Sequence, residues 1–199
     1  MSPPVPAPGP RRVISTERIL LVASEESMAE AVADFYRVNR AHLQPWSPPF
    51  SPDLESTSGQ TIRLRNAQRS FEEGSGWRWW MKLQAEPQRI IGFAHVSQIV
   101  RGAFQSAMLG YGISSDAEGK GLMSEALSAV LDEVFSPRGK LHRIQANVVP
   151  DNVRSLALME RLGFEREGLA PEYLFIDNEW KDHVMLAKRN PNYDPNWLP

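Results

Sequence analysis

Residues 118–123 read EGKGLM, and this stretch decides the fold because it joins a predicted strand, residues 107–114, to the most regular predicted helix, residues 119–135. A glycine-rich turn at a helix start leaves backbone N–H groups unpaired beside the positive end of the helix dipole, where an anion such as a pyrophosphate binds. A G-x-G pair alone is equally typical of a simple turn. Neither the Walker pattern nor the three-glycine dinucleotide fingerprint is present.

A second motif follows about thirty residues later. After a predicted strand at residues 142–149, residues 151–164 read DNVRSLALMERLGF. Taken alone, this pattern has a structural explanation: Asp151 or Asn152 caps a helix, and Gly163 ends it in a left-handed conformation. The ordered combination of the two motifs is therefore more specific than either one.

Strand-like and helix-like periodicities alternate through the remainder of the chain. Trp77 and Trp79 share one strand face, which is typical of core packing, and Asp177–Asn178 predicts the turn of a closing hairpin. The fold class is therefore mixed α/β (α+β), a central sheet with flanking helices. The predicted strands are residues 18–23, 77–83, 89–96, 107–114, 142–149, 173–176 and 180–186, and the predicted helices are residues 27–39, 54–73, 119–135 and 152–162.

The first helix and the segment after it have distinct local signals. Ser27 to Glu30 match a capping box, which predicts that the helix starts there. Residues 42–52 contain four prolines and two large aromatic residues, and proline forbids a regular helix. We therefore expect a shaped loop between the first two helices.

The two ends of the chain differ in composition from the middle. Residues 1–10 hold five prolines, which predicts an extended segment, and we expect residues 1–12 to be a flexible proline-rich arm. The folded domain is expected over residues 13–189. Residues 190–199 form a C-terminal tail that Tyr193 and Trp197 can pin to the domain.

The composition excludes several classes of function. The 199 residues have a net charge of -2, so the basic footprint of a dedicated nucleic-acid binder is absent. The chain contains no cysteine, and its four histidines are more than forty residues apart, so we expect neither a disulfide nor a metal site. No apolar run is long enough for a membrane span. We expect a cytoplasmic protein whose partners are neither membranes nor specific nucleic-acid sequences.

The two motifs in this order resemble the GNAT superfamily of N-acetyltransferases. Further stretches are similar to the ribosomal-protein-alanine N-acetyltransferases of the RimJ type within that superfamily. The resemblance covers about residues 14–187 and implies the GNAT fold, a mixed sheet with a splayed strand at a β-bulge. The stretches are HLQPW (42–46), VRGAF (100–104), LGYGI (109–113), GKGLM (119–123) and WKDHV (180–184).

The resemblance implies an acetyl-CoA site and no metal. Backbone N–H groups at the start of the 119–135 helix would hold the pyrophosphate. The pantetheine would run between the strands 107–114 and 142–149, separated by a bulge at the strand glycines, and the first of these strands would donate to the thioester carbonyl. The implied cofactor-binding residues are Leu109, Gly110, Tyr111, Gly112, Ile113, Gly119, Lys120, Gly121, Leu122, Met123, Asn152 and Ser155.

Two positions of this cofactor site have particular consequences. By the resemblance, Ser155 is a proton donor to the departing CoA thiolate. Asp116 departs from the superfamily pattern, which has Gln or Arg three residues before the first glycine. An acidic residue near a pyrophosphate is unfavourable, so this departure predicts slightly weaker binding of the cofactor.

On the acceptor side, the resemblance assigns the general base to Glu172, directly before Tyr173. The alternative explanation of Glu172 is an ordinary solvated charge. A peptide α-amine has a pKa of about 7.7 to 8.0, so a modest base such as a carboxylate is sufficient to keep it neutral. Trp46, Arg101 and Tyr173 are the predicted contacts of the acceptor, with Arg101 facing an acidic peptide.

The sequence therefore predicts direct transfer of an acetyl group from acetyl-CoA to a primary amine. By resemblance, the acceptor is the N-terminal alanine of ribosomal protein S5. Two alternatives stay open: an acetyltransferase for another protein N-terminus or a small-molecule amine, and a ribosome-binding assembly factor in which catalysis is secondary.

Overall fold

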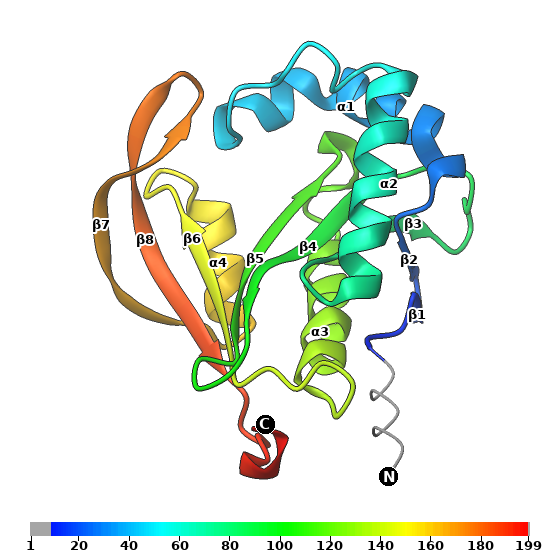
Figure 1. Ribbon diagram of the computed structural model, residues 1–199. Coiled ribbons are helices and arrows are strands. Elements are labelled where there is room, and N and C mark those ends of the chain that lie inside the picture. Colours follow the sequence, from blue (N-terminus) through cyan, green and yellow to red (C-terminus); the bar gives the residue numbers. More distant parts are fainter. Residues whose placement is uncertain (1–8, 199) are drawn as a thin grey trace, which may run out of the picture.

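Residues 9–198, which the computed structural model describes, contain one mixed sheet. Its strands are β1 Val13–Ser15, β2 Ile19–Ala23, β3 Trp77–Leu83, β4 Gly92–Val100, β5 Ser106–Ile113, β6 Arg143–Val148, β7 Glu165–Ile176 and β8 Glu179–Arg189. The spatial order is β1-β2-β3-β4-β5-β6-β8-β7, and every neighbouring pair is antiparallel except β5 and β6 (Figure 1). This is the predicted fold class.

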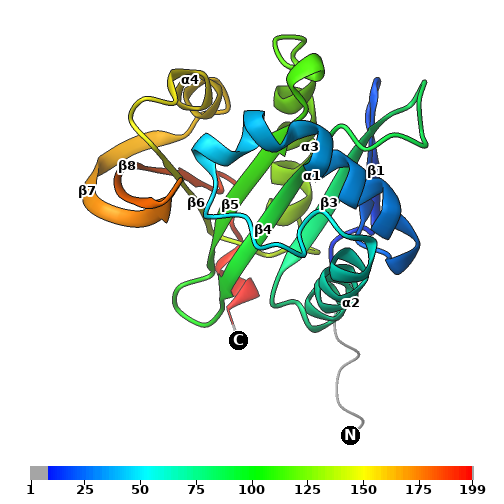
Figure 2. The same ribbon diagram turned by 90° about the horizontal axis from the view of Figure 1, so that it is seen from above.

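Helices cover both faces of the sheet. Figures 1 and 2 place α1 (Ala29–Leu43) and α2 (Thr57–Glu73) over one face, and α3 (Leu122–Phe135) and α4 (Val153–Arg161) over the other. Short 3-10 turns are η1 (Glu26–Met28), η2 (Gln44–Trp46), η3 (Ser115–Ala117) and η4 (Pro195–Trp197). The arrangement follows from strand alternation, since successive side chains of β3 point to opposite faces of the sheet. Trp79 packs in the hydrophobic cluster that contains residues of α3, and Trp80 packs in the cluster that contains residues of α1.

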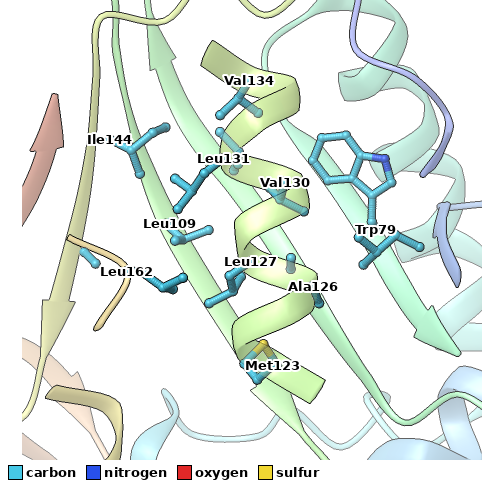
Figure 3. Packing of buried hydrophobic residues seen from close by; sticks show 14 of the residues in the cluster. Trp79, Leu109, Met123, Ala126, Leu127, Val130, Leu131, Val134, Ile144 and Leu162 are labelled. Carbon is cyan, nitrogen blue, oxygen red and sulfur yellow. The ribbon is translucent and has the colours of Figure 1, made fainter. Parts of the chain in front are cut away.

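The larger core lies between the sheet and α3 (Figure 3). Apolar residues at helical spacing put one continuous stripe of α3 against the sheet, as its sequence predicts. Trp77 and Trp79 are both buried, which confirms their assignment to the core. The stripe consists of Met123, Ala126, Leu127, Val130, Leu131 and Val134.

The sheet is incomplete in its middle. The parallel β5–β6 pairing contains only three residue pairs, which join Ser106, Ala107 and Met108 of β5 to β6. Beyond Met108 the two strands separate. The predicted bulge at Gly110 and Gly112 is wrong, because both glycines stay in regular register with β4; the irregularity lies instead between Ser97 and Val100 of β4.

Three local predictions differ from the structure. The capping box is wrong, because the residues before α1 form the turn η1 and no side chain caps the helix. Helix α1 also continues to Leu43, whose buried side chain belongs to the smaller core, and so enters the predicted loop. Strand β7 starts at Glu165 rather than Tyr173. The turn at Asp177 and Asn178 is confirmed, with φ of 48° and 65°.

The chain ends are held on the domain where they are described. Of the predicted arm, residues 1–8 lie outside the described residues, whereas the backbone carbonyl of Arg11 accepts a hydrogen bond from the Trp79 indole N–H at 2.9 Å. Arg11, which belongs to the predicted arm, is therefore in contact with the sheet. In the tail, the Tyr193 ring lies 5.1 Å from that of His142, in an edge-on arrangement, which confirms the predicted anchoring of the tail.

Candidate active site

A cavity of about 1520 Å³ runs from the β5–β6 separation to the face of the sheet under α1 and α2. Its lining includes two groups of residues, one at each end. The loop end comprises residues 118–124 and 148–155, without Lys120 and Pro150. The aromatic end comprises Tyr36, Trp46, Phe50, Arg63, Arg78, Phe93 and His95.

The loop end is built for an anion. Gly119 and Gly121 have φ of 72° and 73°, a left-handed conformation that favours glycine. Gly121 is the N-cap of α3, and no side chain caps this helix. Within residues 9–198, no backbone or side-chain acceptor is found for the N–H groups of residues 119–124. These unpaired donors at the start of a 14-residue helix fit the expected pyrophosphate.

The acidic residue at position 116 lies outside the cavity lining. Asp116 is not among the cavity residues; its carboxylate is bonded to Arg89 at 2.6 Å. This hydrogen bond lowers the pKa of Asp116. The carboxylate that does line the loop end is Glu118, and Arg154 neutralises it at 2.6 Å. Asp116 is therefore directed away from the anion site.

The separation of β5 from β6 leaves a slot with free backbone groups. The N–H of Ser114 donates to Ile91 across the β4–β5 pair. By the antiparallel register, even-numbered residues of β5 bond to β4, so the odd-numbered residues face β6; the N–H of Leu109 belongs to the last β5–β6 pair, and those of Tyr111 and Ile113 lie beyond it. No residue of β6 pairs with Tyr111 or Ile113. The slot therefore fits an extended chain with donors aimed at its carbonyl groups.

At the boundary between slot and loop end, two hydroxyl groups meet. The Tyr111 hydroxyl lies 2.5 Å from Ser155 Oγ. Asn152, the N-cap of α4, accepts a hydrogen bond from the Ser155 N–H at 3.1 Å and so fixes the start of the helix. Burial raises the pKa of Tyr111 to about 12, and the hydrogen bond from Ser155 offsets this only in part. The pair therefore remains protonated at neutral pH and can donate a proton.

The aromatic end combines packed rings with arginine side chains. The Tyr36 and Trp80 rings are 6.2 Å apart, and Phe93 lies 5.8 Å from Trp80. Burial raises the pKa of Tyr36. Arg78 donates to His95 Nδ1 at 2.9 Å, and burial together with the Arg78 charge lowers the pKa of His95 to about 3. His95 is consequently neutral.

Two glycines make room at this end. The β4–β5 register places Gly110 opposite His95 and Gly112 opposite Phe93. A Cβ atom at Gly112 would approach a Phe93 ring carbon to 2.8 Å, whereas one at Gly110 would meet nothing within 4 Å. The space above Gly110 is therefore open, beside the free N–H groups of the slot.

The three predicted acceptor residues lie in different parts of the structure. Trp46 lines the aromatic end. Tyr173 accepts a hydrogen bond from Asn147, a cavity residue, at 3.0 Å. Arg101 lies outside the cavity, where it donates to the Gly139 carbonyl at 2.8 Å. Figure 1 shows the β4–β5 connection at the end of the sheet away from α1, so the structure does not bring Arg101 together with the other predicted acceptor residues.

Glu172 lies on the exposed β7–β8 hairpin and does not line the cavity. Its φ of 45° is left-handed, and its N–H donates to the Asp182 carboxylate at 2.9 Å. At the hairpin tip, the Asp177 N–H donates to the Ser47 carbonyl at 3.1 Å. This bond ties the hairpin to the segment after α1, whose residues line the aromatic end.

The side chains of Tyr111, Arg78 and His95 are functional candidates that sequence reasoning missed. A period-two pattern in residues 77–83 and 89–96 places Arg78 and His95 on strands, but their contact needs the strand register. Within residues 9–198, no group of three or more acidic or histidine residues is placed to hold a metal ion, and no helix has the length and apolar character to cross a bilayer.

Comparison with known proteins identifies relatives of the whole domain. Residues 18–165 match the family model of the acetyltransferase (GNAT) domain. The curated ribosomal protein uS5-alanine N-acetyltransferase of Escherichia coli (strain K12) is 38% identical over 186 residues, which are 94% of this chain and 95% of the relative.

Two solved structures are similar over nearly the same extent. The ribosomal-protein-S5-alanine acetyltransferase from Vibrio fischeri superposes with a TM-score of 0.87 at 31% identity and covers 92% of this chain and 99% of that chain. The Mycobacterium smegmatis RimJ in complex with CoA-disulfide has a TM-score of 0.80 at 29% identity and covers 91% and 86%.

Proposed function

Since this chain belongs to the GNAT acetyltransferase family and is an acetyl-CoA-dependent N-acetyltransferase, we propose that its acceptor is the N-terminal alanine of ribosomal protein uS5. The observation that supports this acceptor is the 38% identity to the Escherichia coli uS5-alanine enzyme, spread over 94% of the chain. The related stretch includes both ends of the cavity. An acceptor made on the ribosome also agrees with the expected cytoplasmic location.

Different groups of the chain would bind the cofactor and polarise its thioester. When bound, acetyl-CoA supplies the acetyl group as an activated thioester. The N–H groups of residues 120–123 would bind its pyrophosphate, with Gly119 and Asn152 shaping the two sides of the loop end. The N–H group of Tyr111 would polarise the thioester carbonyl, as the direction of the free β5 donors indicates.

Proton transfer would depend on a hydroxyl pair and a carboxylate. The Tyr111 hydroxyl and Ser155 form a pair that would give a proton to the departing thiolate. Glu172 would accept a proton from the α-amine, directly or through one water. The left-handed backbone of Glu172 supports a functional constraint, because a glutamate in this conformation is strained and such strain clusters at functional sites.

The proposed acceptor can be tested by intact-mass spectrometry. The protein is mixed with acetyl-CoA and a uS5-type peptide beginning with alanine, and in parallel with the same peptide whose α-amine is blocked but whose lysine is free. We expect one added acetyl group on the first peptide and none on the second. Acetylation of neither peptide, with acetyl-CoA binding shown separately, would assign another amine as the acceptor; ribosome binding without acetyl-CoA binding would favour an assembly factor.

Replacing Glu172 tests the proposed base. We expect Glu172→Gln to lower kcat by about 10- to 100-fold at pH 6 to 7 and by less at pH 9, because an α-amine of pKa about 7.7 to 8.0 is mostly neutral above pH 8 and no longer needs a base. The measurement is a pH–rate profile with the alanine peptide. Glu179→Gln, on the same hairpin, is the control. A profile of Glu172→Gln that matches the wild type would refute this role.

A further inference from the structure

We propose that Arg78 forms an anion subsite at the aromatic end, which binds a carboxylate that the acceptor carries close to its reacting amine. The inference rests on the proposed function in one respect, namely that the acceptor amine enters the cavity at this end. Two sources can present this chemistry: an acidic side chain at the second or third residue of a peptide, or the α-carboxylate of a free amino acid. The peptide is the source that the uS5-type relatives favour.

Two arginines of the cavity lining, Arg78 and Arg161, have no acidic partner within residues 9–198, and of these only Arg78 belongs to the aromatic end, since Arg161 ends α4. Arg63 is bonded to Asp53 at 3.2 Å, and Arg154 to Glu118 at 2.6 Å. Within residues 9–198, no carboxylate lies within 4.0 Å of the Arg78 guanidinium. Its Nε atom is buried and has no hydrogen-bond partner. The Arg78 side chain as a whole is half-buried in the cavity lining, so an incoming carboxylate would meet a cation with no acidic partner and accept charge-assisted hydrogen bonds from it.

The guanidinium is held in place before any acceptor arrives. Its carbon lies 5.3 Å from the centre of the Phe93 ring and 5.8 Å from that of Trp80, which are cation–π distances. Arginine is always a donor, so His95 Nδ1 is the acceptor in their 2.9 Å hydrogen bond. A neutral His95 therefore acts as a positioning residue. Preorganisation of this kind reduces the entropy lost on binding.

The position of Arg78 relative to β5 sets how far the carboxylate lies from the amine. Arg78 pairs with His95 across β3–β4, and His95 pairs with Gly110 across β4–β5. Two strand spacings of about 4.8 Å separate the backbones of β3 and β5 by about 10 Å. The Arg78 side chain reaches toward β4, which shortens this span. A carboxylate one or two residues from an amine above Gly110 can therefore reach the guanidinium.

The test compares peptides that differ in charge alone. Peptides beginning Ala-Glu and Ala-Gln, together with free alanine, are offered to the wild type, and kcat/KM for acetylation is measured. The dissociation constants of the two peptides for the CoA-loaded protein give a second, turnover-independent measurement. For the wild type we expect a preference of about tenfold or more for Ala-Glu, since hydrogen bonds to charged groups are among the stronger ones.

Variants of Arg78 and Arg63 show which arginine is responsible for the preference for Ala-Glu over Ala-Gln. In Arg78→Gln we expect the Glu/Gln ratio to fall to about one, and in Arg78→Lys to recover in part, because lysine restores the charge without the planar fork. Arg63→Gln is the matched control: its guanidinium lies at the same end but is already paired with Asp53, so the ratio should stay at the wild-type value. Binding of acetyl-CoA to each variant shows that it is folded.

The outcomes separate the two proposals. Equal kcat/KM and equal affinity of the wild type for Ala-Glu and Ala-Gln would overturn the Arg78 subsite, whether or not the variants fold. A Glu preference that Arg78→Gln leaves intact would overturn it as well. Absence of acetylation on every peptide would refute the proposed function alone, because the affinity ratio still tests Arg78. Acetylation of free alanine that depends on Arg78 would support the subsite and assign the carboxylate to an amino acid.

Discussion

Gly119→Glu is expected to raise the dissociation constant for acetyl-CoA by about 100-fold or more, which corresponds to about 2.7 kcal/mol. The new carboxylate would stand among the unpaired N–H groups of residues 119–124, where the pyrophosphate is expected. Two like charges about 4 Å apart repel each other by about 1 to 4 kcal/mol, depending on how far solvent screens them. A Cβ at Gly119 meets nothing within 4 Å, so the effect comes from charge rather than from a clash. Isothermal titration calorimetry gives the constant directly.

Gly74→Glu is a closely matched control for this substitution. Gly74 ends α2 with φ of 71°, compared with 72° for Gly119, and a Cβ there also meets nothing within 4 Å. Both variants place a glutamate in the left-handed region, at a cost of about 1 to 2 kcal/mol. We expect similar losses in Tm but an unchanged dissociation constant for Gly74→Glu. Equal weakening of binding by both variants would show that lost stability, and not the anion site, is responsible.

Tyr111→Phe is expected to lower kcat by about 100-fold, with little change in the affinity for acetyl-CoA. General acid catalysis contributes about 100- to 10,000-fold, and phenylalanine keeps the ring that packs against the larger core. Ser155→Ala should have a similar effect. Since the two hydroxyls act as one unit 2.5 Å apart, the double variant should be about as slow as the slower single variant. Single-turnover kinetics with a saturating acceptor measures the chemical step.

The pH dependence gives a further check on this pair. Because the pKa of Tyr111 is raised to about 12, the hydroxyl is protonated throughout pH 6 to 9, and the ratio of wild-type to Tyr111→Phe kcat should be constant over that range. Tyr193→Phe is the control, since the Tyr193 hydroxyl lies outside the cavity and is buried without a partner. Additive losses in the double variant, or an equal loss in Tyr193→Phe, would contradict a shared proton-donating role.

The fold was predictable where apolar periodicity is strong. Helix α3 follows directly from its stripe, and β3 from its alternating tryptophans. Strand β7 was largely missed because nearly all of its side chains are exposed, so it has no buried face to produce a pattern; its pairing with β8 holds it in place. The start of α1 was misplaced because the turn η1 precedes it and replaces a side-chain cap.

The backbone part of the candidate site was predictable, whereas its side-chain contacts were not. The G-x-G turn and the Asn152 cap are local features that short motifs encode. Tyr111 and Ser155 lie 44 positions apart, and their contact depends on how α4 packs over the slot. Arg101 was assigned to the acceptor because it follows a strand that lines the cavity, but it follows the end of that strand remote from the cavity. Sequence proximity to β4 does not show which end of β4 is functional.

The incomplete sheet has a thermodynamic consequence for the whole protein. Three residue pairs join β5 to β6, so the two halves of the sheet depend on a short ladder and on the helices that cross it. Binding of acetyl-CoA along the slot would satisfy amides that the ladder leaves open, and by linkage a ligand at 100 times its dissociation constant adds about 2.7 kcal/mol to the free energy of unfolding. Supply of the acetyl donor and resistance to unfolding are therefore coupled, and the loaded enzyme would tolerate destabilising substitutions that the empty chain would not.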